Sequence, residues 1–316
     1  MACEIIGGLG IFLLGMKYMS DGMQAVAGNS LRRMIGLATN NRFLATIVGT
    51  AVTVVVQSSS VTTVMVVGFV NSGVMELAQG VGVIMGANIG TTITGWILVL
   101  NIGKYGLPIL GAAAFIYLFS KGDRWRYWAM AFMGVGMVFF GLEIMKDACA
   151  AIKDLPEFEA WFQRFDASTY PGILGCALAG CLLTMVVQSS SATLGITISL
   201  AFQGVISYET AAALVLGENI GTTITAILAS IGATTNARRA AYFHVLFNII
   251  GVFWITLVFD QYIEMIQWLV VGDVTKAVVQ NGEEVFPHTT AAIAAASLTS
   301  SIRFCSCRSR QCSSAC

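Results

Sequence analysis

Two short polar runs stand inside otherwise apolar stretches of this sequence. Both read Gln-Ser-Ser-Ser, and they begin at Gln57 and at Gln188. Serine hydroxyls can donate hydrogen bonds to an anion, and the amide oxygen of glutamine can ligate a hard cation such as sodium. About a dozen mostly apolar residues flank each run on both sides, so the polar groups need a cavity or a protein partner to face.

A second polar motif, Asn-Ile-Gly-Thr-Thr, follows each run at the same distance. It begins at Asn88 and at Asn219, each 31 residues after the corresponding glutamine, so both motifs repeat at one offset of 131 residues. Self-similarity at a fixed offset indicates that one unit was duplicated. The asparagine amide oxygens and the threonine hydroxyls add acceptors that suit sodium. The threonines concerned are Thr91, Thr92, Thr222 and Thr223.

The two copies differ at one ionisable position. Glu218 precedes Asn219, whereas Ala87 precedes Asn88. An ionisable group at membrane depth is a functional candidate by default, so Glu218 is a candidate proton or cation site. A lone serine or threonine in a membrane helix more commonly packs against a neighbouring helix. Duplication in register favours a functional role for the whole set.

The composition indicates a membrane protein. Of the 316 residues, 56% are hydrophobic and 11% are charged, against about 25% charged residues in soluble domains. Apolar stretches close to the roughly 20 residues needed to span a bilayer recur along the chain. Basic and acidic residues balance at 17 each, which gives no reason to expect a nucleic acid partner. We therefore predict an all-α, multi-pass integral membrane protein.

The apolar pattern predicts both the helices and two interruptions. Helices are expected at residues 5–27, 78–101, 105–120, 127–147, 209–232 and 240–260, with a last one starting near 288. Residues 43–71 and 171–203 are instead broken at their centres by the Gln-Ser-Ser-Ser runs. The half-length arms of these stretches favour re-entrant helical hairpins with polar tips.

The positive charges test this topology. Short cytoplasmic loops carry an excess of Lys and Arg. The basic clusters near Arg33, Arg124 and Arg238 all fall on one side only if both broken stretches re-enter the membrane. The two hairpins then enter from opposite sides, which predicts repeats of inverted topology, each with a hairpin and a broken transmembrane helix.

The predicted organisation has three parts. The first repeat covers residues 1–126, with its broken helix at Asn88 to Thr94, and the second covers 127–300, with its broken helix at Asn219 to Thr225. Residues 301–316 form an atypical tail rich in Cys, Ser and Arg.

Neither cysteine nor histidine has the spacing of a transition-metal site in the apolar segments. Cys3, Cys149, Cys176 and Cys181 are expected to be small buried hydrophobes. Four more cysteines crowd into the tail, where a zinc site is the alternative. His244 and His288 lack a partner at metal spacing, so no role is assigned to either.

Inverted repeats with broken helices near the midplane are the usual frame of a secondary transporter. Helix N-termini at the hairpin tips would offer free N–H groups to an anion. An enzyme such as an intramembrane hydrolase would need a base beside its nucleophile, and neither histidine is near the serine runs in sequence. An anion channel on the same fold and a transporter of another oxyanion remain as alternatives.

With both Gln-Ser-Ser-Ser runs, both Asn-Ile-Gly-Thr-Thr motifs and the element from His244 to Asn248, the chain resembles the type II sodium-phosphate cotransporter family, in a compact form like its bacterial members. The resemblance covers roughly residues 5–295. Two features depart from the family pattern. Glu218 stands where a small or polar residue is more usual, and the tail lacks the helical continuation expected after His288.

The resemblance implies uptake of inorganic phosphate coupled to sodium influx by alternating access, in the bacterial inner membrane. The phosphate-binding residues implied are Gln57, Ser58, Ser59, Ser60, Gln188, Ser189, Ser190 and Ser191. Sodium is implied to bind the same runs and the neighbouring threonines, with Asn88 and Asn219 added by their chemistry. The implied partners are phosphate, sodium and the lipid bilayer, with no cofactor besides the coupling ions, and a homo-oligomer is left open.

Overall fold

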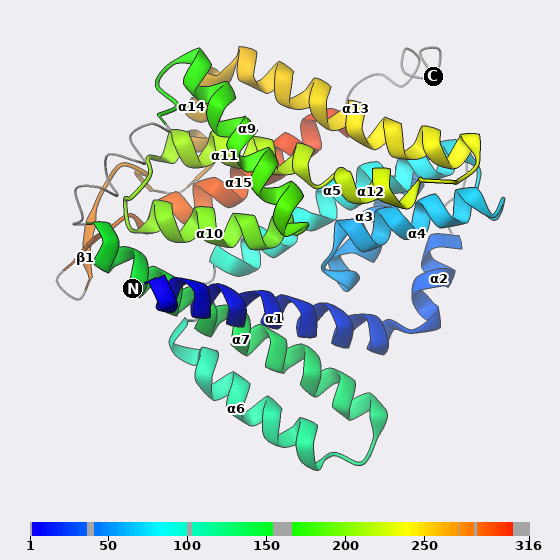
Figure 1. Ribbon diagram of the computed structural model, residues 1–316, viewed down its shortest axis with the longest axis horizontal. Helices are drawn as coiled ribbons and strands as arrows, with labels where there is room; N and C mark the ends of the chain where they lie inside the picture. Colours follow the sequence, from blue (N-terminus) through cyan, green and yellow to red (C-terminus); the bar gives the residue numbers. More distant parts are fainter. Residues whose placement is uncertain are drawn as a thin grey trace.

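The computed structural model describes residues 2–36, 41–99, 103–153, 166–270, 272–280 and 283–305. These residues are mostly helical, and one two-stranded ribbon stands apart at one end of the molecule (Figure 1). The first part of the chain forms α1 (Ala2–Ala27), α2 (Asn29–Gly36), α3 (Arg42–Val56), α4 (Ser59–Asn71), α5 (Leu77–Val99), α6 (Gly103–Phe119) and α7 (Asp123–Lys153). The second part forms α9 (Tyr170–Val187), α10 (Ser190–Phe202), α11 (Tyr208–Gly221), α12 (Ile224–Ala229), α13 (Thr235–Leu257), α14 (Phe259–Leu269), β1 (Val278–Gln280), β2 (Glu283–Val285) and α15 (Pro287–Cys305).

Within the described residues, six helical segments are long and apolar enough to cross a membrane. They are Cys3–Ala27, Leu77–Val99, Asp123–Ala148, Tyr170–Val187, Tyr208–Ala229 and Thr235–Leu257. Each has at least the roughly 17 residues at the lower end of the range for a membrane-spanning helix. The described chain is mostly helical and has several candidate membrane spans, which is consistent with the predicted helical membrane protein.

Both stretches predicted to be broken are helix-turn-helix hairpins. The first is α3–α4 and the second is α9–α10, and in each the turn falls at the Gln-Ser pair. The sequence pattern missed α2, α14 and the β1–β2 ribbon, in which Val278 pairs with Val285. These elements are short, and α2 and α14 alternate polar with apolar residues, so they lack the continuous apolar run on which the segmentation depended.

The broken helix predicted in both copies occurs in one. In the second copy, α11 ends at Gly221 and α12 begins at Ile224, whereas α5 runs without interruption through Asn88 and Thr94. The break expected in α5 is therefore absent. The motif itself does not explain the difference, because its threonines form the same side-chain bonds in both copies. Instead, α12 packs against α4 and α13, away from the line of α11.

Each hairpin lies directly on the next long helix of its copy. A side chain on Gly86 of α5 would collide with the carbonyl oxygen of Thr46 on α3, and one on Gly217 of α11 would collide with that of Ala177 on α9. Small residues that let backbones approach closely are the usual means of helix association in membranes. The duplicated glycines therefore give both copies the same packing.

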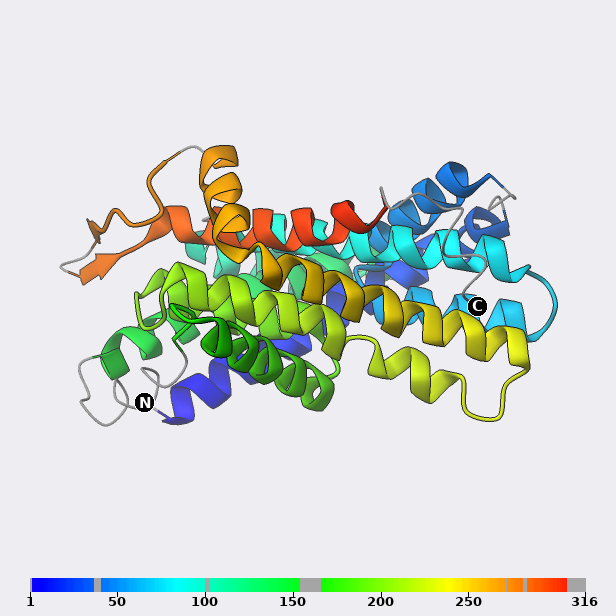
Figure 2. The same ribbon diagram turned by 90° about the horizontal axis from the view of Figure 1, so that it is seen from above.

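Two further helices bridge the copies. Both α13 and α15 contact α5 and α11, and they also contact each other; in Figure 2, α15 lies along the upper edge of the bundle and α13 runs below it. The helical continuation thought to be missing after His288 is present, because α15 reaches Cys305; residues 306–316 of the predicted tail lie outside the described residues. Cys176 and Cys181 are buried as expected, but Cys3 is exposed.

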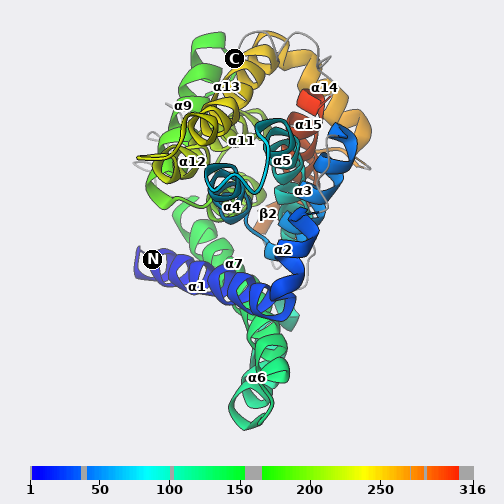
Figure 3. The same cartoon turned by 90° about the vertical axis from the view of Figure 1, so that its right-hand side faces the viewer.

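The pair α6 and α7 projects from the rest of the molecule. Figure 3 shows α6 extending from the bundle, with α7 between it and the hairpins. Much of α7 packs along α1, whereas the main neighbour of α6 is α7. The α6 surface accordingly exposes large apolar side chains, including Phe115, Leu118 and Phe119.

Candidate functional site

The first hairpin tip is built from two helix ends. Gln57 follows α3 in the left-handed conformation, with φ 57° and ψ 24°, and its N–H bonds to the carbonyl oxygen of Thr53. Ser58 then caps α4, and its hydroxyl oxygen accepts from the N–H of Val61 at 3.3 Å. The N–H groups of Ser59 and Ser60 lie in the first turn, where a helix offers no intrahelical acceptor.

The second tip has the same backbone. Gln188 has φ 55° and ψ 23°, and Ser189 caps α10 by accepting from the N–H of Ala192 at 3.3 Å. These glutamines are the non-glycine residues with positive φ in the described chain. A left-handed non-glycine residue costs on the order of 1–2 kcal/mol, and such strain clusters at functional sites. The duplicated strain singles out both tips.

A threonine pair ties the arms of each hairpin below the tip. The hydroxyls of Thr53 and Thr62 lie 3.0 Å apart in the first hairpin, and those of Thr184 and Thr193 lie 3.2 Å apart in the second. All four side chains are fully buried. Because these bonds join the two arms across the turn, they fix the spacing at which the serines and the helix N-terminus are presented.

The two glutamine side chains have different surroundings. Gln57 is buried, and its amide donates to the carbonyl of Val54 and accepts from the hydroxyl of Thr94 at 2.9 Å. This bond joins the first tip to α5. Gln188 is exposed and its side chain bonds to no other described residue. Thr225, which corresponds to Thr94, donates instead to the carbonyl of Thr222.

Asn88 is held at both ends of its amide by α13. The Nε2–H of His244 donates to Asn88 Oδ1 at 3.1 Å, and Asn88 Nδ2 donates to Asn248 Oδ1 at 3.2 Å. The Asn248 amide in turn donates to the backbone carbonyl of His244 at 2.8 Å. His244 is 1% exposed, and its Nδ1 has no partner among the described residues. A predicted cation ligand is thus part of a network that joins α5 to α13.

Asn219 has a different anchor. Its Nδ2 donates to the hydroxyl of Ser300 on α15 at 3.1 Å, and no described residue bonds its carbonyl oxygen. That oxygen keeps its acceptor capacity, whereas the corresponding oxygen of Asn88 is already engaged. The sequence assigned no role to His244 or Ser300. The shared motif from His244 to Asn248 could have indicated a role for His244, whereas nothing in the sequence indicated one for Ser300.

The threonines of the motifs use their protons within their own helices. Thr91 donates to the carbonyl of Ala87 at 3.1 Å, and Thr222 donates to that of Glu218 at 2.8 Å. Thr92 and Thr223 each donate to the carbonyl three residues earlier, at 2.7 Å. A hydroxyl that donates still has two lone pairs, so these oxygens remain suitable cation ligands.

Glu218 is buried between α11 and α10. It is 3% exposed, and its Oε1 accepts from the hydroxyl of Thr197 at 3.0 Å. Among the described residues, no lysine or arginine pairs with it. The corresponding positions in the first copy are Ala87 and Val66, which are apolar. The polar pair belongs to the second copy alone.

The second hairpin also reaches the first copy. Leu194 of α10 lies against Gly95 of α5, where an added Cβ would be 3.1 Å from its Cδ2. Both copies therefore meet along α5, at the residue directly after the Thr94 that holds the first tip. Within the described residues, no group of three or more His, Cys, Asp or Glu side chains could hold a metal ion.

Comparison with protein families decides the family. Residues 11–147 and 156–273 match the family described as Na+/Pi-cotransporter, which covers both hairpins and both Asn-Ile-Gly-Thr-Thr motifs. The chain belongs to the Na+/Pi-cotransporter family. The resemblance seen in the motifs is confirmed, and the chain is a multi-pass membrane protein of a transporter family, in bacteria of the inner membrane.

Individual relatives differ in how much of their length is matched. The chain is 29% identical over 241 residues to the protein YqeW of Bacillus subtilis, covering 76% of this chain and 77% of that one. It is 28% identical over 248 residues to YjbB of Escherichia coli, whose name assigns it to inorganic phosphate export, covering 78% of this chain and 45% of that one.

A human relative is matched over a shorter segment. The human sodium-dependent phosphate transport protein 2B is 36% identical over 98 residues, which cover 30% of this chain and 14% of that protein. No solved structure matches the chain.

Proposed function

We propose that this chain is a secondary active transporter that couples sodium influx to the uptake of inorganic phosphate by alternating access. The observation that carries the proposal is the duplicated tip, in which a strained glutamine and a serine-capped helix N-terminus recur with the same dihedral angles. Membership of a sodium and phosphate cotransporter family supports the cargo.

Phosphate would bind between the tips. Each tip supplies first-turn N–H groups at a helix N-terminus, whose partial positive charge attracts anions without a buried lysine or arginine. The serine hydroxyls add donors that can rotate to fit the oxyanion. The proposed ligands are Gln57, Ser58, Ser59 and Ser60 at one tip, and Gln188, Ser189, Ser190 and Ser191 at the other.

Sodium would bind beside the phosphate, through oxygens that remain free to accept. Gln188 and Asn219 have uncommitted amide oxygens, and the four motif threonines keep their lone pairs. Gln57 and Asn88 would first have to share or release the bonds to Thr94 and His244. We therefore assign the stronger sodium site to the second copy.

The lengths of the hairpin arms support re-entry and inverted repeats. The arms α3, α4 and α10 have 15, 13 and 13 residues, below the roughly 20 that span a bilayer, whereas α9 has 18 and is the one arm of membrane-spanning length. With both hairpins entering from opposite sides, the binding groups of the two copies would meet near the midplane, as in other transporters with inverted repeats. A non-enzymatic role follows from this proposal.

Transport in sealed liposomes tests the proposal. Labelled phosphate should accumulate under an inward sodium gradient and not when potassium replaces sodium. Ser190→Ala should raise the apparent Michaelis constant for phosphate about tenfold, as the loss of one donor predicts. Ser199→Ala is the matched control, because that hydroxyl bonds only the carbonyl of Gly195 in its own helix. Phosphate flux that ignores sodium, with both serine variants alike, would reject the coupled mechanism.

Outward transport is the second candidate, because the name of the Escherichia coli relative assigns it to phosphate export. Liposomes preloaded with labelled phosphate distinguish the two directions. Efflux driven by an outward sodium gradient, without uptake under the inward one, would assign export. Counterflow with unlabelled phosphate separates a carrier from an anion channel, and competition by sulfate or arsenate reports the choice of oxyanion.

A further inference from the structure

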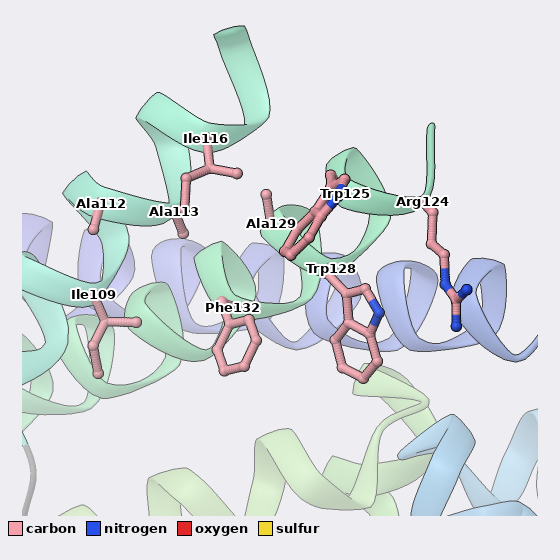
Figure 4. A pocket seen from close by; sticks show the side chains of 9 residues that line it. All are labelled: Ile109, Ala112, Ala113, Ile116, Arg124, Trp125, Trp128, Ala129 and Phe132. Carbon is pink, nitrogen blue, oxygen red and sulfur yellow. The ribbon is translucent and has the colours of Figure 1, made fainter. Parts of the chain in front are cut away.

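A groove of about 670 Å³ lies between α6 and α7, on the part of the molecule that projects from the bundle. Figure 4 shows its lining. Small side chains from both helices form the floor, namely Ala112, Ala113 and Ala129, and Trp128 and Phe132 form one wall. Ala113 and Ala129 are buried while Ala112 and Phe132 are exposed, so the hollow opens sideways.

The groove has a cation at one end. Arg124 is the charged residue of the lining, it is exposed, and no described residue forms an ion pair with it. Nearby, Arg126 stacks over the ring of Tyr117 at 5.3 Å and Lys121 is exposed, while Asp123 is the acidic residue of this turn. The segment from 121 to 126 is thus positive overall, and it follows directly from an apolar helix.

These features specify the occupant. In a membrane protein, a sideways apolar groove faces hydrocarbon, which favours a chain of linked methylene groups. The unpaired guanidinium at its end needs an anion, and guanidinium binds phosphate oxygens in pairs. Basic side chains beside a membrane helix attract anionic lipids by about 1 kcal/mol each. A second copy of this chain would fill the groove only by bringing an acidic group to Arg124.

We propose that the α6–α7 groove binds an anionic phospholipid, with one acyl chain against the alanine floor and the headgroup phosphate on Arg124. The two helices contact each other but share little surface with the bundle apart from the packing of α7 on α1, with a weaker contact to α10. A bound lipid would therefore fill a hollow that the protein leaves at its own periphery. The site is separate from the hairpin tips, and it does not depend on which ion they transport.

Native mass spectrometry of the full chain in detergent tests the proposal. The protein is titrated with phosphatidylglycerol or with phosphatidylcholine of the same acyl chains. Phosphatidylglycerol should bind with a clear preference, and Arg124→Gln should reduce that preference about fivefold. Ala112→Phe should reduce binding of both lipids, because the phenyl ring fills the groove from an exposed position. The matched control Ala114→Phe changes a neighbour outside the lining and should bind like the wild type. Lys121→Gln removes a basic charge outside the lining and should reduce the preference less than Arg124→Gln does.

Three results would overturn the proposal. Equal binding of the two lipids by the wild type would remove the role of charge. An unchanged preference in Arg124→Gln, with a melting temperature like that of the wild type, would place the anion elsewhere. A dimer that disappears in Ala112→Phe would make the groove an interface between copies. Arg124→Gln alters an exposed side chain, so it keeps the test decisive even where Ala112→Phe fails to fold.

Discussion

The two hairpin tips share a backbone but differ in what their glutamines contact. Gln57 and Gln188 have nearly the same dihedral angles, yet Gln57 is buried and bonded to Thr94 while Gln188 is exposed. The cause lies in the following helix. In unbroken α5, Thr94 faces the tip, whereas the break after Gly221 leaves Thr225 bonded to Thr222. The local sequence determines the backbone conformation of each tip. The following long helix determines whether the glutamine side chain of that tip is hydrogen-bonded.

The largest expected effects come from the packing that the copies share. Gly86→Val and Gly217→Val would each drive a side chain into the backbone of the hairpin arm. A core that can shift around an extra methylene loses about 1–3 kcal/mol; here the added side chain meets a backbone carbonyl, so the loss should exceed that range and both variants should lose most of the folded protein, measured by size-exclusion chromatography after extraction. Gly10→Ala is the control, since nothing lies within 4 Å of that position. If one of the two variants folds normally while the other does not, the hairpins of the two copies do not depend equally on this packing.

The next largest difference between the copies is expected in the stability that the partners of Asn88 and Asn219 contribute. His244→Ala removes a buried side chain and leaves the Asn88 oxygen without its donor, which should cost about 3 kcal/mol. Ser300→Ala removes a single hydroxyl partner of Asn219 and should cost about 1 kcal/mol. Thermal unfolding of the purified variants measures both, and His244→Gln should recover part of the loss because its amide can still donate. Equal losses would mean that the anchors are equivalent after all.

A smaller effect is expected where the tips differ. Thr94→Val leaves the buried Gln57 oxygen without a donor, which should lower stability by about 1–3 kcal/mol and reduce sodium-dependent phosphate uptake. Thr225→Val is the matched change in the second copy and should have less effect, because Thr225 does not bond Gln188. Uptake and melting temperature are measured together. If Thr225→Val proves the more damaging, the held tip is the second one in the functional protein.

The smallest effect concerns the entries to the hairpins. Asn41 caps the first, whereas a turn at Asp166 leads into the second. The hydroxyl and N–H of Ser168 donate to Asp166 and hold its pKa below the ordinary value of 3.8. The turn is therefore stabilised fully above pH 3.8 and loses that stabilisation as the pH falls through the lower value. The protection against hydrogen exchange near Ser168, taken relative to the intrinsic exchange rate at each pH, should fall in acid, and the protection near Asn41 should not; Asp166→Asn should remove the difference.

The sequence predicted the turns of both hairpins correctly, but it did not predict that α5 is continuous. The Gln-Ser pairs located both turns because a polar run inside a short apolar stretch cannot continue a membrane helix without a partner. The glycine of the Asn-Ile-Gly-Thr-Thr motif predicted a break in α5 as well, and that prediction was wrong: α5 is continuous, and Asn88 is held by α13 residues 156 and 160 positions away. Contacts at such separations leave no periodic signal in the chain. Glu218 was identified by its type alone, and its partner Thr197 needed the structure.

The close contact between α3 and α5 limits how the protein can deform. At Gly49 and Gly86 no side chains separate the two backbones, because each glycine lies against a carbonyl of the opposite helix. Two helices that contact through side chains can slide past each other when the side chains change rotamer. Two helices in direct backbone contact cannot adjust in this way. The helices α3 and α5 are therefore expected to move as one rigid unit, and bending should occur in turns outside their contact, such as the turn at Gly73 between α4 and α5, where φ is 73°.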